Sequence, residues 1–298
     1  MEFNCDDLSS PLVSVGIPTY NRLQGLKRTL ECITSQTYQN LEIIVSDNAS
    51  YDPEISIIMN EYMKNDKRIR YFRQHENIGA YNNFKFVLNK SSGEYFMWAA
   101  DDDEWSPDFI ADCLCIMQNK KVDTVMCQFA VHNRIKNTVE EQQVPRLTPE
   151  KSLFSNLKMF ISNMTPSIVY GLHRRKTLDF FQGISSAFDY LDCVFVIRQI
   201  CCTNGVFVTD KYLYVAGIDT QDYSVKPANV RKGKVLEYKP FIKNVVKLIV
   251  TSNKLNMVEK CSLLKLFLSL ILTLFITFEK KVRPIQTKIA SLIFKFIF

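Results

Sequence analysis

Three consecutive aspartates, Asp101, Asp102 and Asp103, directly follow a short apolar run, Tyr95 to Trp98. Adjacent carboxylates repel one another, so such a run usually persists where a cation shares its charge. Carboxylate oxygens are hard ligands that suit Mg²⁺ or Mn²⁺, and these ions need neither His nor Cys. The residues therefore predict a divalent-metal site. The alternative is an acidic loop that caps the helix expected to begin near Pro107.

Another acidic residue, Asp47, follows a second apolar run, Leu41 to Val45. Short apolar runs of this kind are typical of buried strands, and here they alternate with segments of helical periodicity. This alternation predicts an α/β fold with a mostly parallel sheet flanked by helices. Because ligands bind beyond the carboxyl ends of the strands in such sheets, Asp47 and the three aspartates should meet at one edge.

The first 120 or so residues give the clearest element predictions. We expect strands at residues 13–18, 41–45, 70–73 and 95–98, and helices at 23–33, 53–65, after Gly79, and at 107–118. The pattern weakens after residues 122–129. There we expect a polar loop at 136–150, strands at 168–173 and 206–208, and a helix at 189–201.

Five short motifs stand in a fixed order along this part of the chain. They are VSVGIPTYNR from Val13, VSDNAS from Val45, ENIG from Glu76, GEY from Gly93 and DDDEWSP from Asp101. Together they resemble the family 2 glycosyltransferases, which are inverting, nucleotide-sugar-dependent enzymes with the GT-A fold. The resemblance covers residues 11–118 well and residues 160–217 loosely.

The resemblance implies a metal ligand set. The family binds Mn²⁺ or Mg²⁺ through a D-x-D motif, and Asp101-x-Asp103 has that spacing. Many members read Asp-Ala-Asp-Asp, which would place Ala100 where the first carboxylate belongs. Asp102 and Asp103 are then the principal ligands, and Asp101 substitutes for the missing carboxylate. The bound ion would neutralise the charge that grows on a nucleoside diphosphate leaving group.

The resemblance also implies a nucleotide-binding set. It comprises Pro18, Thr19, Tyr20, Asp47, Asn77, Gly79, Asn83 and Asp101. Asp47 would accept a hydrogen bond from the imino group of the base. Three alternatives stay open: Asp47 as a helix cap or Asx-turn residue, Tyr20 as a core residue, and Asn77 with Gly79 as an ordinary turn.

Inverting transfer needs a general base that takes a proton from the acceptor hydroxyl. Family members often supply it from an aspartate at the start of a helix. Asp189 and Asp192 both stand at such a position, and we favour Asp189 because it leads the helix before an aromatic residue. Either residue could instead be only a helix N-cap.

The chain divides by charge and composition. Residues 231–298 hold 14 Lys and Arg against three acidic residues, a balance of +11, which leaves residues 1–230 at −5. We therefore expect a catalytic domain over residues 1–225 and a basic, amphipathic helical tail over residues 226–298. In the apolar run from Cys261 to Phe278, polar residues recur every three or four positions. A narrow polar stripe favours lying on an anionic membrane surface; packing on the catalytic domain and a membrane span are the alternatives.

The combined interpretation is a glycosyltransferase that moves a sugar from a nucleotide donor, UDP- or dTDP-linked by preference, to a glycan or lipid-linked glycan. The sequence resembles those of bacterial enzymes that synthesise surface polysaccharide, such as O-antigen or capsule. We expect a peripheral position at the cytoplasmic face of the inner membrane and no nucleic-acid partner. The rival interpretations are a nucleotidyltransferase, which would want a glycine-rich phosphate loop after the first strand, and a membrane-bound module with a degenerate sugar-nucleotide site.

Overall fold

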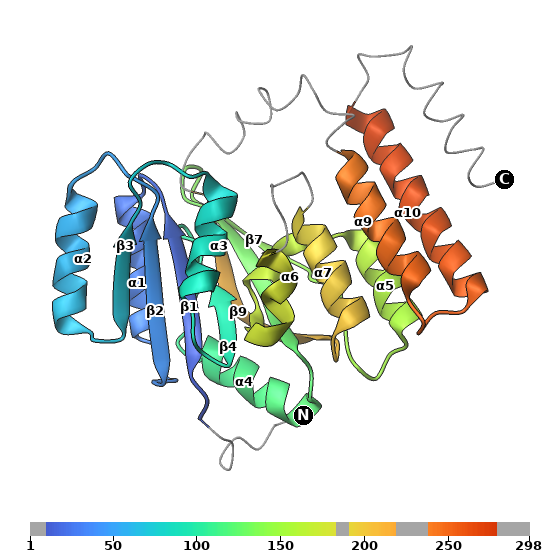
Figure 1. Cartoon of the computed structure of the whole chain (residues 1–298), viewed down its shortest axis with the longest axis horizontal. Helices are drawn as coiled ribbons and strands as arrows, with labels where there is room; N and C mark the ends of the chain where they lie inside the picture. The colour runs from blue at the N-terminus through green and yellow to red at the C-terminus, as the bar shows by residue number, and fades with distance from the viewer. Residues whose placement is uncertain (1–9, 183–190, 219–237, 279–298) are drawn as a thin grey trace.

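The computed structural model describes residues 10–182, 191–218 and 238–278, and in these segments helices flank a central sheet (Figure 1). Along the sheet the strands follow the order β3-β2-β1-β4-β8-β6-β9-β5, and β7 pairs with β6 outside this row. One continuous apolar core lies between the strands and the helices.

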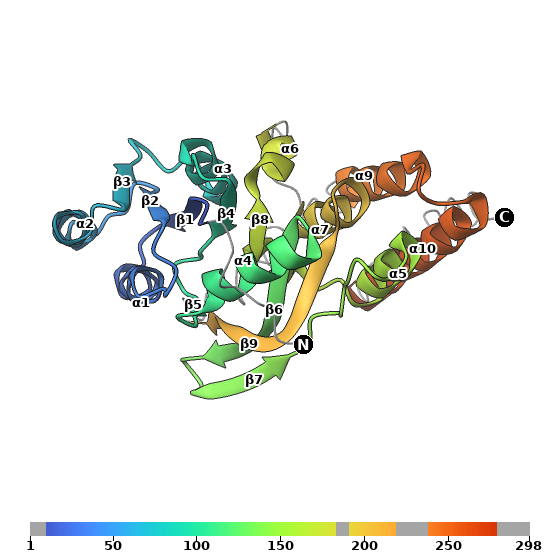
Figure 2. The ribbon, with the colours of Figure 1, turned by 90° about the horizontal axis from the view of Figure 1, so that it is seen from below.

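The first half of the sheet is parallel, as the apolar runs predict. It contains β1 (Val13–Thr19), β2 (Leu41–Asp47), β3 (Ile69–Arg73) and β4 (Tyr95–Trp98), joined by α1 (Leu23–Thr34), α2 (Glu54–Asn65) and α3 (Ala80–Lys90). β1 lies between β2 and β4 and runs in the same direction as both. Helices α1 and α3 cover opposite faces of this half (Figure 2). Every residue of β1 is buried, as expected for a strand with helices on both faces.

The second half of the sheet is mixed, so the prediction of a mostly parallel sheet holds only for the first half. β8 (Leu172–Arg174) is antiparallel to both β4 and β6 (Thr124–Asn133), and β6 is parallel to β9 (Val206–Ile218). The strand expected at residues 168–173 is mostly wrong, because Pro166–Tyr170 form the 3-10 helix η1 and only the last residues join the sheet.

The polar loop expected at residues 136–150 is also partly wrong. It contains β7 (Thr138–Gln142), which forms an antiparallel hairpin with β6. Most of the β7 residues are exposed, so this strand lacks the alternation of apolar and polar residues that marks a half-buried strand. Helix α5 (Leu153–Asn163) follows, although no pattern predicted it, and the side chain of Ser152 caps its first turn. The remaining elements are β5 (Glu104–Trp105), α4 (Phe109–Lys120), η2 (Arg175–Leu178), α6 (Asp179–Gln182) and α7 (Leu191–Cys202).

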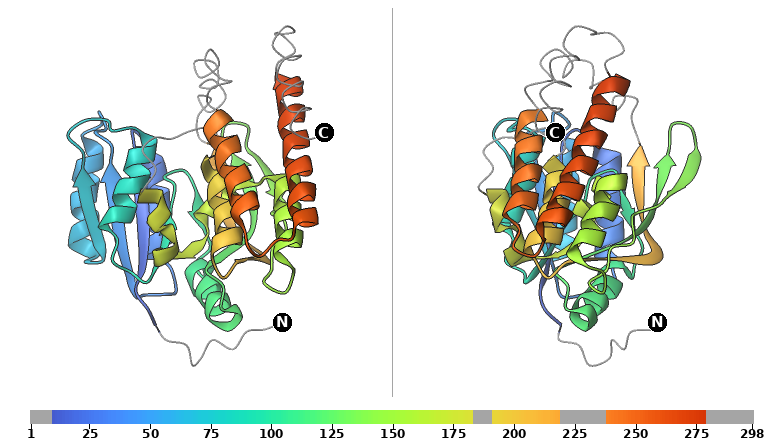
Figure 3. Two further views of the ribbon diagram at one scale, coloured as in Figure 1. Left: turned by 45° about the vertical axis from the view of Figure 1, so that its right-hand side comes forward. Right: turned by 90° about the vertical axis from the view of Figure 1, so that its right-hand side faces the viewer.

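Two helices of the expected tail, α9 (Tyr238–Thr251) and α10 (Met257–Phe278), stand beside α7 and α5 (Figures 1 and 3). The boundary expected between residues 225 and 226 lies outside the described residues and stays a prediction. No helix within the described segments combines the length and the hydropathy that crossing a membrane requires.

The predicted polar stripe of α10 is present where its side chains are described. Ser262, Lys265 and Ser269 are exposed on one side of the helix. On the other side Leu263, Phe267 and Ile271 are buried, and the ring of Phe267 packs edge-on against that of Phe241 in α9. This part of the apolar stripe therefore packs on the protein, which was one alternative to membrane contact.

Candidate active site

The sheet brings the predicted acidic residues to one edge. In the parallel register Thr19, at the end of β1, lies opposite Asp47 at the end of β2. β4 lies on the other side of β1, and the three aspartates follow its carboxyl end. Thr19 Oγ1 donates a hydrogen bond of 2.7 Å to Asp101 Oδ2. The prediction from topology that these residues share one edge is therefore correct.

Asp101 is buried against the turn that follows β1. Its Oδ2 also accepts a 3.4 Å hydrogen bond from the amide of Tyr20, and its Oδ1 lies 3.3 Å from an amino group of Arg22. Burial raises the pKa of the Asp101 carboxyl to about 6, even though the charge of Arg22 acts in the opposite direction. The carboxylate therefore depends on neighbouring donors and cations to remain charged.

Asp102 is buried as well and forms an ion pair with the same amino group of Arg22. Its backbone oxygen accepts a 3.0 Å hydrogen bond from Arg134, the residue directly after β6, whose other amino group pairs with Glu104. Two arginines thus hold this short segment, one through the side chain of Asp102 and one through its backbone.

Asp103 points toward β9. Its carboxylate accepts hydrogen bonds from the hydroxyl of Tyr214 and, at 2.8 Å, from the amide of Gly217. Burial, and next the charge of Asp102, raise the pKa of the Asp103 carboxyl to about 8. Burial also holds the pKa of Tyr214 well above its ordinary value, so the phenol remains a hydrogen-bond donor. Sequence reasoning missed both partners, although a glycine inside a strand signals the close approach of another backbone.

Replacing Gly217 by alanine is expected to lower the free energy of unfolding by about 1–3 kcal/mol, because an added Cβ would overlap the backbone oxygen of Asp102 and the Arg134 side chain. Chemical denaturation measures the change. An unfolding midpoint equal to that of the wild type would show that the end of β9 is free to move away from the aspartates.

Asp47 is fully buried and already has several partners. Its carboxylate accepts hydrogen bonds from the amide of Ser50 at 2.9 Å and the hydroxyl of Tyr71 at 3.0 Å, and lies 3.4 Å from Nε of Arg73. The Ser50 bond is the local turn contact that the alternative interpretation expects. Burial raises the pKa of Tyr71 to about 12. Recognition of a nucleotide base by Asp47 stays a prediction.

The other expected nucleotide residues surround the same edge. Pro18 is buried in β1 beside Ser46, and the Tyr20 ring meets the exposed Tyr51 ring edge-on at 6.0 Å. Asn83 Nδ2 donates to the backbone oxygen of Ser46 at 2.9 Å, and Asn83 Oδ1 accepts from the Ser46 hydroxyl at 2.6 Å. These contacts tie α3 to β2.

Asn77 and Gly79 form a turn, which is one of the alternatives stated above. The Asn77 side-chain oxygen accepts hydrogen bonds of 2.9 Å from the Gly79 amide and from the Asn48 side chain. Gly79 has a φ of +82°, a conformation that suits glycine. This turn leads directly into α3.

Of the two candidate bases, Asp189 lies outside the described residues. Asp192 lies in the first turn of α7 and is exposed to solvent, yet the protein around its carboxyl raises its pKa through burial. The choice between the two aspartates stays a prediction.

The types of ligand atom in the acidic cluster suit a divalent cation, but the side chains do not converge on one point in this structure. The aspartates offer the hard oxygen donors that Mg²⁺ and Mn²⁺ prefer. However, no three acidic, His or Cys side chains in the described segments converge to hold a metal ion. Arg22 pairs with both Asp101 and Asp102, and Asp103 is bonded to Tyr214 and Gly217. The aspartates are suitable ligands for the ion, and binding it would require the Arg22 side chain to leave Asp101 and Asp102.

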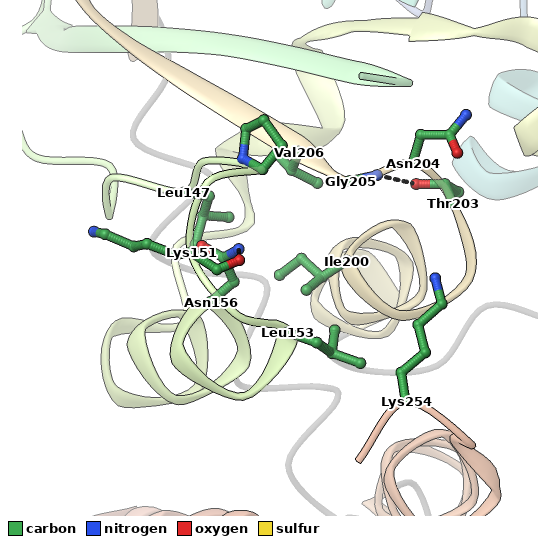
Figure 4. Close-up of a pocket in the computed structure, with 11 residues that line it drawn as sticks. Leu147, Lys151, Leu153, Asn156, Ile200, Thr203, Asn204, Gly205, Val206 and Lys254 are labelled. Atoms are coloured by element: carbon green, nitrogen blue, oxygen red, sulfur yellow. Dashed lines mark hydrogen bonds between the residues drawn. The ribbon is translucent and has the colours of Figure 1, made fainter. Parts of the chain in front are cut away.

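A separate pocket of about 210 Å³ opens at the edge of the sheet opposite to the one that carries the aspartates (Figure 4). It lies where β9 begins, between α5, α7 and the α9–α10 connection. Lys151 and Lys254 line it together with Asn156, Thr203 and Asn204. Because β9 runs from this pocket toward Asp103, the pocket and the acidic cluster belong to opposite ends of one strand.

The chain belongs to glycosyl transferase family 2, because the profile of that family matches residues 14–181, more than half of its 298 residues. The match contains the three aspartates, Arg22 and the parallel half of the sheet except Val13, the first residue of β1.

Among curated relatives, a Campylobacter jejuni GalNAc(5)-diNAcBac-PP-undecaprenol beta-1,3-glucosyltransferase is 40% identical over 95 residues, 32% of this chain and 30% of its own. Glycosyltransferase GlyG of Streptococcus pneumoniae is 33% identical over 117 residues, 39% of this chain and 38% of its own. The matches thus span between about a third and a half of the first curated relatives.

Solved structures extend the likeness to nearly the whole chain. Residues 1–349 of S. aureus TarS in complex with UDP-GlcNAc match with a TM-score of 0.69 and 18% identity, over 91% of this chain and 76% of that TarS fragment. A Pyrobaculum calidifontis mannosyltransferase in complex with GDP-Man and Mn²⁺ matches with a TM-score of 0.55 and 16% identity, over 97% of this chain and 81% of its own. At these identities the likeness shows the fold, which is the expected GT-A arrangement.

Proposed function

We propose that this chain is a metal-dependent, inverting glycosyltransferase that moves a sugar from a UDP- or dTDP-linked donor to a glycan or lipid-linked glycan. The observation that carries the proposal is the buried run Asp101 to Asp103 at the carboxyl edge of the sheet, joined to the end of β1 by Thr19. A negatively charged cluster of this kind suits a divalent cation, and the same cation can neutralise the diphosphate of a nucleotide-sugar donor. The name of the Campylobacter relative, whose acceptor is linked to undecaprenol, supports a lipid-linked acceptor. A role in surface polysaccharide synthesis, such as O-antigen or capsule, stays part of the proposal.

Each residue has a distinct task in this proposal. Asp102, Asp103 and Asp101 would hold Mn²⁺ or Mg²⁺, which when bound neutralises the departing diphosphate. Thr19 and the Tyr20 amide keep Asp101 in place, and the turn at Asn77 and Gly79 shapes the border of the nucleotide site. Asp189, or else Asp192, takes the proton from the acceptor hydroxyl as it attacks from the side opposite the leaving group.

The proposal is tested by screening UDP-, dTDP- and GDP-sugars for thermal stabilisation of the protein in Mn²⁺, and then for release of the nucleotide. A transferase releases nucleoside diphosphate and gives a product of inverted anomeric configuration, which NMR detects. Release of pyrophosphate would instead indicate a nucleotidyltransferase. Binding without turnover of any donor, with acceptors present, would indicate a degenerate binding module.

We also propose that the chain lies peripherally on the cytoplasmic face of the inner membrane, held by its basic C-terminal segment. The excess of positive charge after residue 231 supports this position, because the anionic surface of the cytoplasmic leaflet attracts Lys and Arg. Because Leu263, Phe267 and Ile271 of α10 are buried in the protein, we propose that the membrane contact is made by other residues of the basic C-terminal segment. Removing α10 would therefore expose core residues and is a poor test.

Replacing Lys280, Lys281, Arg283 and Lys288 by glutamine is expected to weaken binding to anionic vesicles by up to about 1 kcal/mol per charge. High salt should weaken binding in the same way. Flotation with liposomes of varied anionic content measures the effect.

A matched control replaces four exposed lysines of the catalytic part, Lys64, Lys67, Lys136 and Lys176, by glutamine. The control should float like the wild type. Vesicle binding that ignores both lipid charge and salt would contradict the electrostatic attachment.

A further inference from the structure

We propose that the guanidinium of Arg22 and a divalent cation compete for the same two carboxylates, so that metal binding and donor binding are coupled through Arg22. The inference rests on the proposed function, since it assumes that the acidic cluster takes a metal and a nucleoside diphosphate. It assigns to Arg22 a role that its place in the Pro18 to Arg22 motif does not reveal.

The position of Arg22 is the first argument. One amino group of its side chain lies 3.3 Å from Asp101 Oδ1 and also pairs with Asp102 Oδ2, so it bridges the two carboxylates. All three side chains are largely withdrawn from solvent, with 21% of the Arg22, 10% of the Asp101 and 7% of the Asp102 side chain exposed. The amino group thus stands where an ion shared by the two aspartates would bind.

Electrostatics gives the second argument. Two neighbouring buried carboxylates need a cation, and the guanidinium supplies it in the absence of metal. A divalent ion cannot share the same oxygens with the guanidinium, because the two positive charges repel each other at that distance. Without a nucleotide, Arg22 therefore lowers the affinity of the cluster for the metal.

The surrounding turn shows which part of Arg22 moves. The backbone amide of Asn21, the residue before it, donates a 2.8 Å hydrogen bond to the Ser50 hydroxyl, and Asn21 Oδ1 accepts a 2.8 Å hydrogen bond from the Tyr51 amide. Arg22 itself is the N-cap of α1, and its backbone oxygen accepts from the Leu26 amide at 2.9 Å. The backbone is fixed on both sides, so the long side chain is the part that can leave the carboxylates.

A nucleoside diphosphate offers Arg22 a new partner. Guanidinium groups bind phosphate oxygens through paired hydrogen bonds, and such charge-assisted bonds are strong. Moving from the aspartates to the diphosphate would free the carboxylates for the metal and stabilise the donor at once. Donor and metal then strengthen each other's binding, as reciprocal coupling requires.

The test is titration of the full chain with Mn²⁺ alone, with the hydrated free ion measured by electron paramagnetic resonance. Arg22→Gln keeps most of the length of the side chain and removes its charge. The Kd of this variant for Mn²⁺ should therefore be about tenfold or more below that of the wild type. The control is Arg134→Gln. It removes a positive charge that contacts the backbone of Asp102 and the side chain of Glu104 but does not lie between the two carboxylates. Its Kd should change much less.

A second arm adds UDP as the probe. In the wild type, UDP should lower the Kd for Mn²⁺, whereas in Arg22→Gln the effect of UDP should largely disappear, because its linking residue is gone. Circular dichroism checks that the variant is folded, and Mn²⁺ should raise its Tm more than that of the wild type. If Arg22→Gln aggregates, Arg22→Lys replaces it, and the Kd of the lysine variant for Mn²⁺ should be lower than that of the wild type.

A folded Arg22→Gln whose Kd for Mn²⁺ equals or exceeds that of the wild type overturns the inference, and so does an Arg22→Lys variant that binds no tighter than the wild type. These results differ from failure of the proposed function, in which the wild type releases nucleotide from none of the donors screened.

Discussion

Replacing Asp102 by asparagine is expected to lower the rate of sugar transfer by about 10³-fold or more, because it removes one of the charges that hold the cation against the diphosphate. Asparagine has nearly the shape of aspartate, and the Asp102 backbone contact to Arg134 does not involve the side chain. The fold should therefore survive, which circular dichroism and thermal unfolding can verify. Initial rates with saturating donor and acceptor measure the loss.

The matched control is Asp108→Asn, a carboxylate a few residues further on that is exposed and accepts a 3.0 Å hydrogen bond from Thr37. It should transfer sugar at nearly the wild-type rate. Wild-type activity in Asp102→Asn, or full activity of the wild type in excess EDTA, would refute the metal role. Asp103→Ala is also expected to abolish transfer, but it removes the acceptor for Tyr214 and Gly217 as well, so its effect mixes chemistry with structure.

Replacing Asp189 by asparagine is expected to lower the turnover number by about 10² or more while donor affinity stays nearly constant. The reason is that a general base acts on the acceptor and makes no contact with the donor, so its loss affects kcat and leaves donor binding intact. Turnover numbers and donor Kd values, measured separately, show the division.

Asp192→Asn is the natural companion, because this carboxyl stands three residues later in the first turn of α7. If Asp192→Asn is crippled and Asp189→Asn behaves normally, the base is Asp192. In that case the raised pKa of the Asp192 carboxyl, a result of burial, would make it the stronger proton acceptor at a given pH above that pKa. Normal turnover in both variants would show that neither Asp189 nor Asp192 is the general base.

The parallel half of the sheet could be predicted largely because β1, β2 and β4 are buried on both faces, whereas the edge strand β3 is only partly buried. β1 then reads as a short, mainly apolar run in which only Ser14 and Gly16 separate the apolar residues, and its end is marked by Pro18 and the polar residues after it. The same rule placed β2 and β4, and with them the edge at which Thr19 meets Asp101.

The mixed half gave weaker signals for identifiable reasons. β7 is exposed along most of its length, so its Thr-Val-Glu-Glu-Gln sequence resembles a loop. β8 has only three residues, too few for any period to show. Its contact with β6 instead depends on Gly171, where an added Cβ would overlap the backbone oxygen of Val125. Such a requirement becomes visible only when both strands are placed.

The candidate site divides in the same way. The aspartates themselves stand out, because three adjacent carboxylates after an apolar run need an explanation. Their partners do not: Arg22 is one charged residue among many, and Tyr214 and Gly217 lie 111 and 114 residues beyond Asp103 in the chain. Local patterns carry no information about contacts at that separation.

This separation also has a consequence for how the protein is made. A ribosome adds about 5–20 residues per second, so roughly 5 to 20 s pass between the synthesis of Asp103 and that of the strand that receives it. During this interval the parallel half can already assemble from contacts between neighbouring segments, while Asp103 remains hydrated and without Tyr214. The edge that carries the three aspartates is therefore completed late, when β9 pairs with β6 and Asp103 is removed from water.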